Sequence, residues 1–293
     1  MASGLSLLLN PSGKGVRIET LLGCYRSCGK TPSEQRLKRL KKPCPIQRST
    51  ATLACSGLPW SGGVQEKITD WERLLRAAAE IQQIIPKAVL VGGTAAAIHA
   101  KHRFSFDANH VLPDLEENFQ ALLDLIESNQ DWQTQRVQPP KLILGRFMGV
   151  ETGLRQLIRK KPLETVEIIL EQKKIVVPTA EEMLRIKGWL ALIRNALRDY
   201  IDLAALSFHL GEKKSIAALD SFNDCYKDIY RKDEVLPLLQ LARQLAEPVP
   251  YDLEDIDIEN YKGIVQPWDT WENIEKQCEE ISSWITTMIA EKK

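Results

Sequence analysis

The sequence has little cysteine, no net charge and no long apolar run. Only six of its 293 residues are cysteine, and 39 basic residues balance 39 acidic ones. No stretch reaches the roughly 20 apolar residues that a transmembrane helix requires. Four cysteines fall in residues 1–63 without the paired spacing of a zinc knuckle, so a zinc site is not expected there. Cys225 and Cys278 fall in helical patterns, and we expect them to be buried thiols.

The zero net charge conceals an uneven distribution. Residues 1–63 contain ten Lys and Arg but only two acids, which leaves 29 basic and 37 acidic residues, a net charge of −8, for residues 64–293. So acidic a body repels phosphate, and it is not expected to coat nucleic acid nonspecifically. Any RNA would have to bind a local basic patch.

Residues 1–63 are predicted to be a disordered basic leader, since they are rich in Ser, Gly, Pro, Lys and Arg and have no sustained periodicity. The apolar run Leu5 to Leu9 is too short for a secretory signal. Two interpretations stay open. The leader is either an organellar transit peptide or, as we favour, the product of a start codon assigned too far upstream, with the protein beginning near Val64.

The remaining sequence predicts an α+β fold, in which a core with a mixed β-sheet over residues 64–179 precedes a helical subdomain over residues 180–293. The patterns of the core predict, in order, a helix, a strand, a short helix, a strand, a helix, a strand and a hairpin: Glu66–Ile85, Ala88–Val91, Ala95–Ala100, Asp107–Val111, Leu115–Glu127, Lys141–Val150, and Thr165–Leu170 with Ile175–Val177. Helical patterns follow over Ala180–Leu210, Lys214–Tyr230, Glu234–Ala246 and Trp268–Ala290.

The stretch Ala88 to Val111 is the most informative part of the chain. A short apolar strand ends at Gly92-Gly93, and Thr94 follows as the expected N-cap of an alanine-rich helix. A helix N-terminus beside two glycines can hold a phosphate. Because side chains alternate along a strand, Asp107 and Asn109 should point the same way, and two oxygen ligands suit Mg²⁺.

A second pattern lies on the predicted helix after Ala180. Lys187, Arg194, Arg198 and Asp202 fall on one arc of this helix, beside a separate apolar arc. This pattern favours a helix that packs by one face and presents cations on the other. The alternative is an ordinary solvated face with an Arg198–Asp202 pair of about 0.2–0.5 kcal/mol.

The two patterns together resemble a known family. Gly92-Gly93-Thr94, Arg103, Ser105 and Asp107-x-Asn109 are similar to the first signature of the AbiEii/AbiGii toxin-type nucleotidyltransferases, which have the minimal nucleotidyltransferase fold. The block from Val177 to Glu182, followed by Lys187, Arg194, Arg198-Asp199 and Asp202-Leu203, resembles the second. The resemblance covers roughly Lys67 to Leu210.

The resemblance implies a toxin of a bacterial toxin–antitoxin or phage-defence system, cytoplasmic, that transfers a nucleotide from a nucleoside triphosphate to RNA, most plausibly a tRNA 3′ end. Asp107 and Asn109 would hold Mg²⁺, and Glu167 is our choice for a third acid, with Glu164 second. The nucleotide would be bound by the other residues of the two signatures: Gly92, Gly93, Thr94, Arg103, Ser105, Lys187, Arg194, Arg198 and Asp199. A cognate antitoxin protein would be a partner.

One departure from the family keeps an alternative open. The family's second aspartate is Asn109 here, and an amide can ligate Mg²⁺ but brings no negative charge. The chain could therefore be a non-catalytic module of this fold that binds nucleotide or a partner protein. A purely structural helical protein would leave the glycine turn and its polar strand unexplained.

Overall fold

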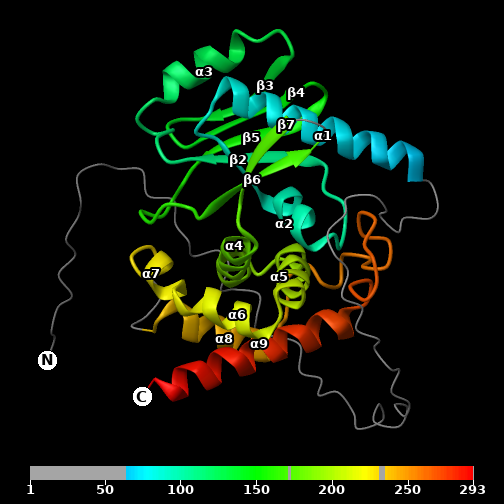
Figure 1. Cartoon of the computed structure of the whole chain (residues 1–293), viewed down its shortest axis with the longest axis vertical. Helices are drawn as coiled ribbons and strands as arrows, with labels where there is room; N and C mark the ends of the chain where they lie inside the picture. Colours follow the sequence, from blue (N-terminus) through cyan, green and yellow to red (C-terminus); the bar gives the residue numbers. More distant parts are fainter. Residues whose placement is uncertain (1–63, 171–172, 231–234, 293) are drawn as a thin grey trace, which may run out of the picture. The chain divides into compact units, whose positions relative to one another are not determined.

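The computed structural model describes residues 64–170, 173–230 and 235–292. The expectations for the leader lie outside these residues. Strands occupy the first part of the described chain and helices the second (Figure 1). The strands are β1 Val89–Val91, β2 Asp107–Leu112, β3 Trp132–Gln138, β4 Leu142–Phe147, β5 Val150–Gln156, β6 Thr165–Leu170 and β7 Lys173–Pro178. The helices are α1 Val64–Ile84, α2 Gly92–Ala100, α3 Phe119–Glu127, α4 Ala180–Arg194, α5 Leu197–Leu210, α6 Glu212–Asp220, α7 Phe222–Tyr226, α8 Pro237–Ala246 and α9 Trp271–Glu291.

Five strands form a mixed sheet in the order β1-β2-β5-β4-β3. The central pair β2 and β5 runs parallel, and the other neighbours are antiparallel. Strands β6 and β7 form a separate antiparallel hairpin, as the sequence predicts. The expected fold class, α+β with a mixed sheet followed by helices, is confirmed.

Helices α1 and α2 pack beside the sheet and bring the site's first segment into place. The apolar stripe of α1 is buried, for example at Leu74, Ala78 and Ile81. Helix α2 begins at Gly92, three residues earlier than expected, so Thr94 lies inside the helix and is not its N-cap. The helix ends at Ala100 and is capped by Lys101, whose backbone has a φ of 52° in the left-handed region.

The sheet differs from expectation at one turn. The predicted single strand Lys141–Val150 is in fact a hairpin, because Met148 and Gly149, at φ values of 51° and 78°, reverse the chain between β4 and β5. Gly149 alone is a weak turn signal, because the first position of such turns usually carries Asn, Asp or Gly and here is Met148. Because of this turn, the sequence patterns do not predict β5 as a separate strand. They do not predict β3 because most of that strand is exposed and lacks an apolar face.

The helical part packs against α2 and β7 through α4 and α5, and the other helices cover the far side of these two (Figure 1). The predicted helix Ala180–Leu210 is divided into α4 and α5, because Asn195 adopts a left-handed φ of 53° and Ala196 is extended. Helix α9 buries an apolar stripe that includes Ile274 and Ile281. Trp268 lies outside that helix but is buried and packs edge-on against Phe208 at 5.6 Å.

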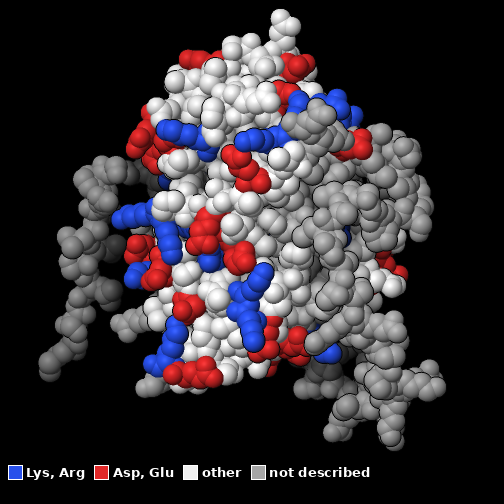
Figure 2. Space-filling model, in the orientation of Figure 1, with Lys and Arg blue, Asp and Glu red and all other residues white. Residues whose placement is uncertain are grey.

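The remaining helices differ from expectation mainly in length. The pattern over Lys214–Tyr230 is divided into α6 and α7, and α3 begins at Phe119 rather than Leu115. In the described part of the chain, no helix combines the length and the apolar character that a membrane crossing requires. On the face shown in Figure 2, basic and acidic side chains are interspersed rather than gathered by sign.

Candidate functional site

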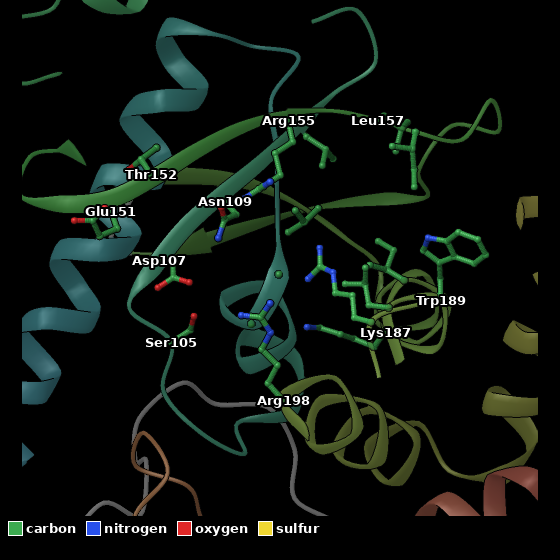
Figure 3. A pocket seen from close by; sticks show the side chains of 18 of the residues that line it. Ser105, Asp107, Asn109, Glu151, Thr152, Arg155, Leu157, Lys187, Trp189 and Arg198 are labelled. Carbon is green, nitrogen blue, oxygen red and sulfur yellow. The ribbon is translucent and has the colours of Figure 1, made fainter. Parts of the chain in front are cut away.

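A cleft of about 440 Å³ opens between the sheet and helices α4 and α5 (Figure 3). It brings together most of the residues that the two sequence patterns single out. The members that line it are Gly92, Gly93, Arg103, Ser105, Asp107, Asn109, Lys187, Arg194 and Arg198. Thr94, Glu167 and Asp199 are the predicted site residues that do not.

Strand β2 presents Asp107 and Asn109 to this cleft. Both side chains are half-buried on one face of the strand, whereas Ala108 and His110 are buried on the other. The alternation that places them together was predicted from the sequence. Thr94 joins α2 to this strand, because its hydroxyl donates a 2.6 Å hydrogen bond to the backbone carbonyl of Asp107. The resemblance predicts that Thr94 binds the nucleotide, but its side chain is fully buried and does not line the cleft.

The glycine turn at the start of α2 is required by space as well as by conformation. Gly92 has a φ of 80°, a left-handed value that favours glycine. At Gly93 an added Cβ would lie 2.5 Å from Nη2 of Arg103 and 3.1 Å from the hydroxyl of Ser105. The absence of a side chain at Gly93 therefore lets Arg103 and Ser105 lie against the turn.

Strand β5 contributes the acid that sequence reasoning missed. In the parallel register of β2 and β5, Asp107 is paired with Glu151, and Figure 3 shows both carboxylates at the same side of the cleft. Glu151 is about half exposed, and it accepts a 2.8 Å hydrogen bond from Arg146. The signal that could have found it is the alternation along Val150–Gln156, which continues past the turn.

Asn109 also has a partner on β5. Its register partner is Gly153, where an added Cβ would lie 2.6 Å from the amide oxygen Oδ1 of Asn109. The missing side chain at Gly153 leaves room for the Asn109 amide to lie over β5. Any larger residue at this position would push Asn109 out of its place.

The sequence predicts that Lys187 is presented as a cation for a ligand, with a solvated face as the alternative, but in the structure Lys187 is held in a buried network. Its Nζ lies 2.6 Å from Asp202 and 3.0 Å from Asp199. Asp202 also accepts hydrogen bonds of 2.7 and 2.9 Å from Arg103, and it lies 2.7 Å from Nε2 of His102. Burial alone would raise the pKa of the Asp202 carboxyl, but Arg103, Lys187 and His102 hold that pKa well below its usual range.

This network changes which cations can attract an anion. The two carboxylates of Asp199 and Asp202 balance the charges of Lys187 and Arg103. Arg155, Arg194 and Arg198 line the same cleft, and within the described residues none of them has an ion pair with a carboxylate. Burial, and after it the charges of Arg194 and Arg198, lower the pKa of Arg155. Three mutually repelling guanidiniums make this part of the cleft a site for an anion.

Glu167 does not belong to this site. It lies on β6, its side chain is 60% exposed, and its carboxylate is 3.0 Å from Nζ of Lys174 across the hairpin. The second choice, Glu164, is paired with Arg185 at 2.6 Å. Both were selected as acids on a later strand, but the later strand beside β2 is β5.

Four basic residues at the end of β5 and just after it, Arg155, Arg159, Lys160 and Lys161, are only partly available to a ligand. Arg159 is buried, and its Nη2 lies 2.6 Å from Glu182. Of these, only Arg155 and Arg159 line the cleft. These basic residues are thus divided between the cleft and the ion pair that joins the segment after β5 to α4.

The oxygen donors of the cleft fit a Mg²⁺ ion better than a metal that needs a cluster of protein ligands. Among the residues that the structure describes, no three acidic, histidine or cysteine side chains gather closely enough to hold a metal. Asp107 and Asn109 nevertheless offer a carboxylate and an amide oxygen on one face of β2. Mg²⁺ typically uses one or two carboxylates and completes its shell with water and substrate phosphates. The donors therefore fit a Mg²⁺ ion that binds together with a polyphosphate.

Comparison with known proteins gives partial matches. No protein-family model matches the chain. The heme uptake protein MmpL11 of Mycobacterium tuberculosis is 31% identical over 121 residues, which is 41% of this chain. The chain spans 12% of the length of this curated relative.

Among solved structures, JHP933 from Helicobacter pylori has a TM-score of 0.46 and 16% identity, covering 78% of this chain and 94% of that chain. An antigenic nucleotidyltransferase-like protein from Paracoccidioides brasiliensis has a TM-score of 0.38 and 14% identity, covering 54% and 90%. With TM-scores below 0.5, the likeness by itself assigns neither a family nor an activity to this chain.

Proposed function

We propose that the protein is a nucleotidyltransferase that moves a nucleotide from a nucleoside triphosphate to an acceptor hydroxyl. One observation carries the proposal. Asp107 and Asn109 on β2 face the same cleft as Arg155, Arg194 and Arg198, which have no ion pair among the described residues, and the glycine turn of α2 lines it as well. A site with oxygen donors on one side and free cations on the other suits a triphosphate with its metal.

The reaction would be one of positioning and charge stabilisation. The acceptor hydroxyl forms a bond to the α-phosphorus, the bond from that phosphorus to the pyrophosphate oxygen breaks, and the hydroxyl proton passes to Asp107 or to water. Negative charge builds up on the departing pyrophosphate. Arg194 and Arg198 are the cations available to stabilise it, because the charge of Lys187 is already balanced by Asp199 and Asp202.

Asp107 and Asn109 would hold Mg²⁺, which when bound supplies positive charge to the phosphate oxygens. Glu151 is the further acid beside them, through its register with Asp107. Lys187 and Arg103 would line the cleft without binding the phosphates as free cations, because Asp202 holds both side chains in place. The backbone of Gly92 and Gly93 would approach the phosphates closely, as a helix N-terminus allows.

The acceptor and the biological role extend the proposal by the resemblance of the two signature blocks. We propose an RNA acceptor, a tRNA 3′ end first, and a role as the toxin of a toxin–antitoxin or phage-defence pair with a cognate antitoxin. The acidic body of the chain requires that such an RNA meet the local cations of the cleft rather than the surface at large. The working compartment would then be the cytoplasm, where triphosphates and tRNA meet.

The proposal is tested by incubating the protein with Mg²⁺, each α-labelled nucleoside triphosphate in turn, and total tRNA. We expect label in the RNA with at least one triphosphate, and its loss in Asp107→Asn. Glu167→Gln is the matched control, because it neutralises an acid outside the cleft, and it should transfer label as the wild type does. Loss of transfer in the control would place the chemistry elsewhere.

Asn109 supports a second candidate, a module of this fold that binds nucleotide or a partner protein without turnover. A second carboxylate normally bridges the two metal ions of such sites, and the amide brings no charge. Asn109→Asp distinguishes the two candidates. If it raises label transfer, the site is a transferase short of one charge. If it stays silent while nucleotide still binds, a metal-dependent transferase role fails.

A further inference from the structure

The cleft continues beyond its charged part into a section that the proposed reaction does not use. This apolar section lies past Arg155, toward α4 and α7. It is formed by side chains from the segment after β5, from α4 and from α7: Leu157, Ile158, Leu163, Ile186, Trp189, Leu190 and Tyr226. Ile158 is 59% exposed, so the section is open to a ligand at that side.

Trp189 gives this section an unsatisfied polar group. Its side chain is 6% exposed, and its indole N–H is buried with no hydrogen-bond partner among the described residues. Figure 3 shows the nitrogen on the side of the ring that faces the labelled side chains of Arg155 and Leu157. A buried donor without an acceptor is unfavourable, so a site of this kind gains when a ligand supplies the acceptor.

The tryptophan is also held rigidly. Its ring stacks on Tyr226 at 4.7 Å with an interplanar angle of 2°, and Tyr230 meets it edge-on at 6.1 Å. The guanidinium of Arg159 lies 5.5 Å from the centre of the Tyr226 ring. This layer of aromatic rings fixes the direction of the indole N–H before any ligand arrives, which favours specific recognition over adaptive packing.

We propose that the apolar section binds the base of the nucleoside triphosphate, and that Trp189 donates its indole N–H to an acceptor atom on the edge of that base. The inference rests on the proposed function and adds the residue that reads the nucleotide. A nucleobase has apolar faces for the leucine and isoleucine side chains and a carbonyl or ring nitrogen for the donor. An acyl chain would pack against the apolar side chains but would offer no acceptor to the indole N–H of Trp189. The two parts of the cleft are continuous, and its volume is within the range of small-molecule sites.

The test compares the affinity of the protein for inorganic tripolyphosphate with its affinity for each of the four nucleoside triphosphates, by calorimetry in Mg²⁺. We expect at least one triphosphate to bind more tightly than tripolyphosphate. Trp189→Phe keeps an aromatic ring but removes the N–H. It should lower that affinity about three- to tenfold, the effect of one lost hydrogen bond, and leave tripolyphosphate binding unchanged.

A second pair of variants covers the case in which Trp189→Phe fails to fold. Ile158→Gln changes an exposed residue inside the section, and Ile169→Gln changes the same residue type, 69% exposed, on β6 outside the cleft. Only Ile158→Gln should weaken triphosphate binding relative to tripolyphosphate.

The outcomes separate the two proposals. Equal affinity for tripolyphosphate and every nucleoside triphosphate overturns base binding while leaving the anion site intact. Failure to bind tripolyphosphate at all overturns the proposed function, and base binding with it. An affinity difference that neither Trp189→Phe nor Ile158→Gln changes places the base elsewhere in the cleft.

Discussion

At the scale of single residues, the charge of the cleft depends on which cations are already paired. Lys187 and Arg103 are neutralised by buried carboxylates, whereas Arg155, Arg194 and Arg198 have no carboxylate partner among the described residues. The sequence cannot distinguish these two groups, because a lysine and an arginine on one helical arc look alike until their partners are known. The sequence resemblance predicts members of both groups to be nucleotide-binding, whereas among the residues that the structure describes only the first group is paired with buried carboxylates.

The free arginines should therefore carry anion affinity. We predict that Arg194→Gln lowers the affinity for tripolyphosphate about tenfold or more, as expected for a lost charge-assisted hydrogen bond. Arg243→Gln, an exposed arginine of α8 outside the cleft, is the matched control and should bind as the wild type does. Both affinities are measured by calorimetry at one ionic strength. An equal loss of tripolyphosphate affinity in the two variants would mean that Arg194 attracts the anion only through long-range charge and does not contact it.

Asp202 should act mainly on stability and position. Removing a buried carboxylate that pairs with three partners leaves Lys187 and Arg103 uncompensated, so Asp202→Ala should lower the free energy of unfolding by about 3–5 kcal/mol. The folded-state pKa of Asp202 is depressed, so its contribution is present above the unfolded pKa near 3.8 and is lost as the pH falls toward the folded value. Urea unfolding between pH 7 and pH 2 should show the wild type approaching Asp202→Ala only below about pH 4. Convergence at higher pH would contradict the paired state.

His110 predicts a different pH dependence. Burial lowers its pKa to about 4, so its folded-state pKa lies below the unfolded value near 6.5. The unfolded chain then binds a proton that the folded chain does not, and stability falls as the pH drops from 6.5 to about 4, by about 1.4 kcal/mol per pH unit at most. His110→Leu should remove that part of the slope in urea unfolding. An unchanged slope would mean that His110 becomes charged in the folded protein.

At the scale of elements, the local patterns predicted whatever depends on regular alternation. The strand Asp107–Leu112 places Asp107 and Asn109 on one face, as a period of two requires. The patterns failed at two residues in left-handed conformation. Met148 reverses the chain and so adds Glu151 and Arg155 to the site, and Asn195 ends α4 so that Lys187 and Asp202 lie on different helices. Methionine carries no turn signal, and a single Asn within a helical pattern is a weak one.

The break at Asn195 should be necessary for the cleft. Its side chain donates a 2.7 Å hydrogen bond to the carbonyl of Val249, and its backbone carbonyl accepts one from the N–H of Tyr251. Asn195→Val should cost about 1–2 kcal/mol or more of unfolding free energy, because a β-branched residue is strained at positive φ. It should also weaken tripolyphosphate binding, since Arg194 and Arg198 flank the break.

Asn195→Gly provides the control for this prediction. Glycine tolerates the left-handed conformation but loses the side-chain hydrogen bonds to Val249, Tyr200 and Gln244, so it should lower stability while keeping the backbone break and the anion affinity. If both variants bind tripolyphosphate as the wild type does, the break does not position the two arginines.

At the scale of the whole molecule, the site is built between two parts with different roles. The sheet supplies the oxygen donors and the glycine turn, and α4 with α5 supplies Arg194 and Arg198 beside the buried, charge-balanced network of Lys187, Asp199 and Asp202. The order of these parts could be predicted from the sequence, because each has its own period of apolar residues. Their pairing across the cleft could not, since no local pattern specifies which strand lies beside β2 or which cation finds a carboxylate.

The two oxygen donors of β2 make Mg²⁺ binding depend on the triphosphate. Because the protein supplies so few ligands, Mg²⁺ alone should leave the midpoint of thermal unfolding unchanged. The midpoint should rise measurably only when Mg²⁺ and a nucleoside triphosphate are added together. A midpoint raised by Mg²⁺ alone would reveal a metal site that does not need substrate phosphates.

The central claim is that a nucleotide, and not a phosphate, is transferred at this cleft. The most direct measurement gives the protein the same triphosphate labelled in turn at the α- and the γ-phosphorus, with total tRNA and Mg²⁺. Nucleotidyl transfer predicts that α-label enters the RNA, that γ-label leaves as pyrophosphate, and that both events disappear in Asp107→Asn. Entry of γ-label into the RNA, or transfer that persists in Asp107→Asn, would contradict it.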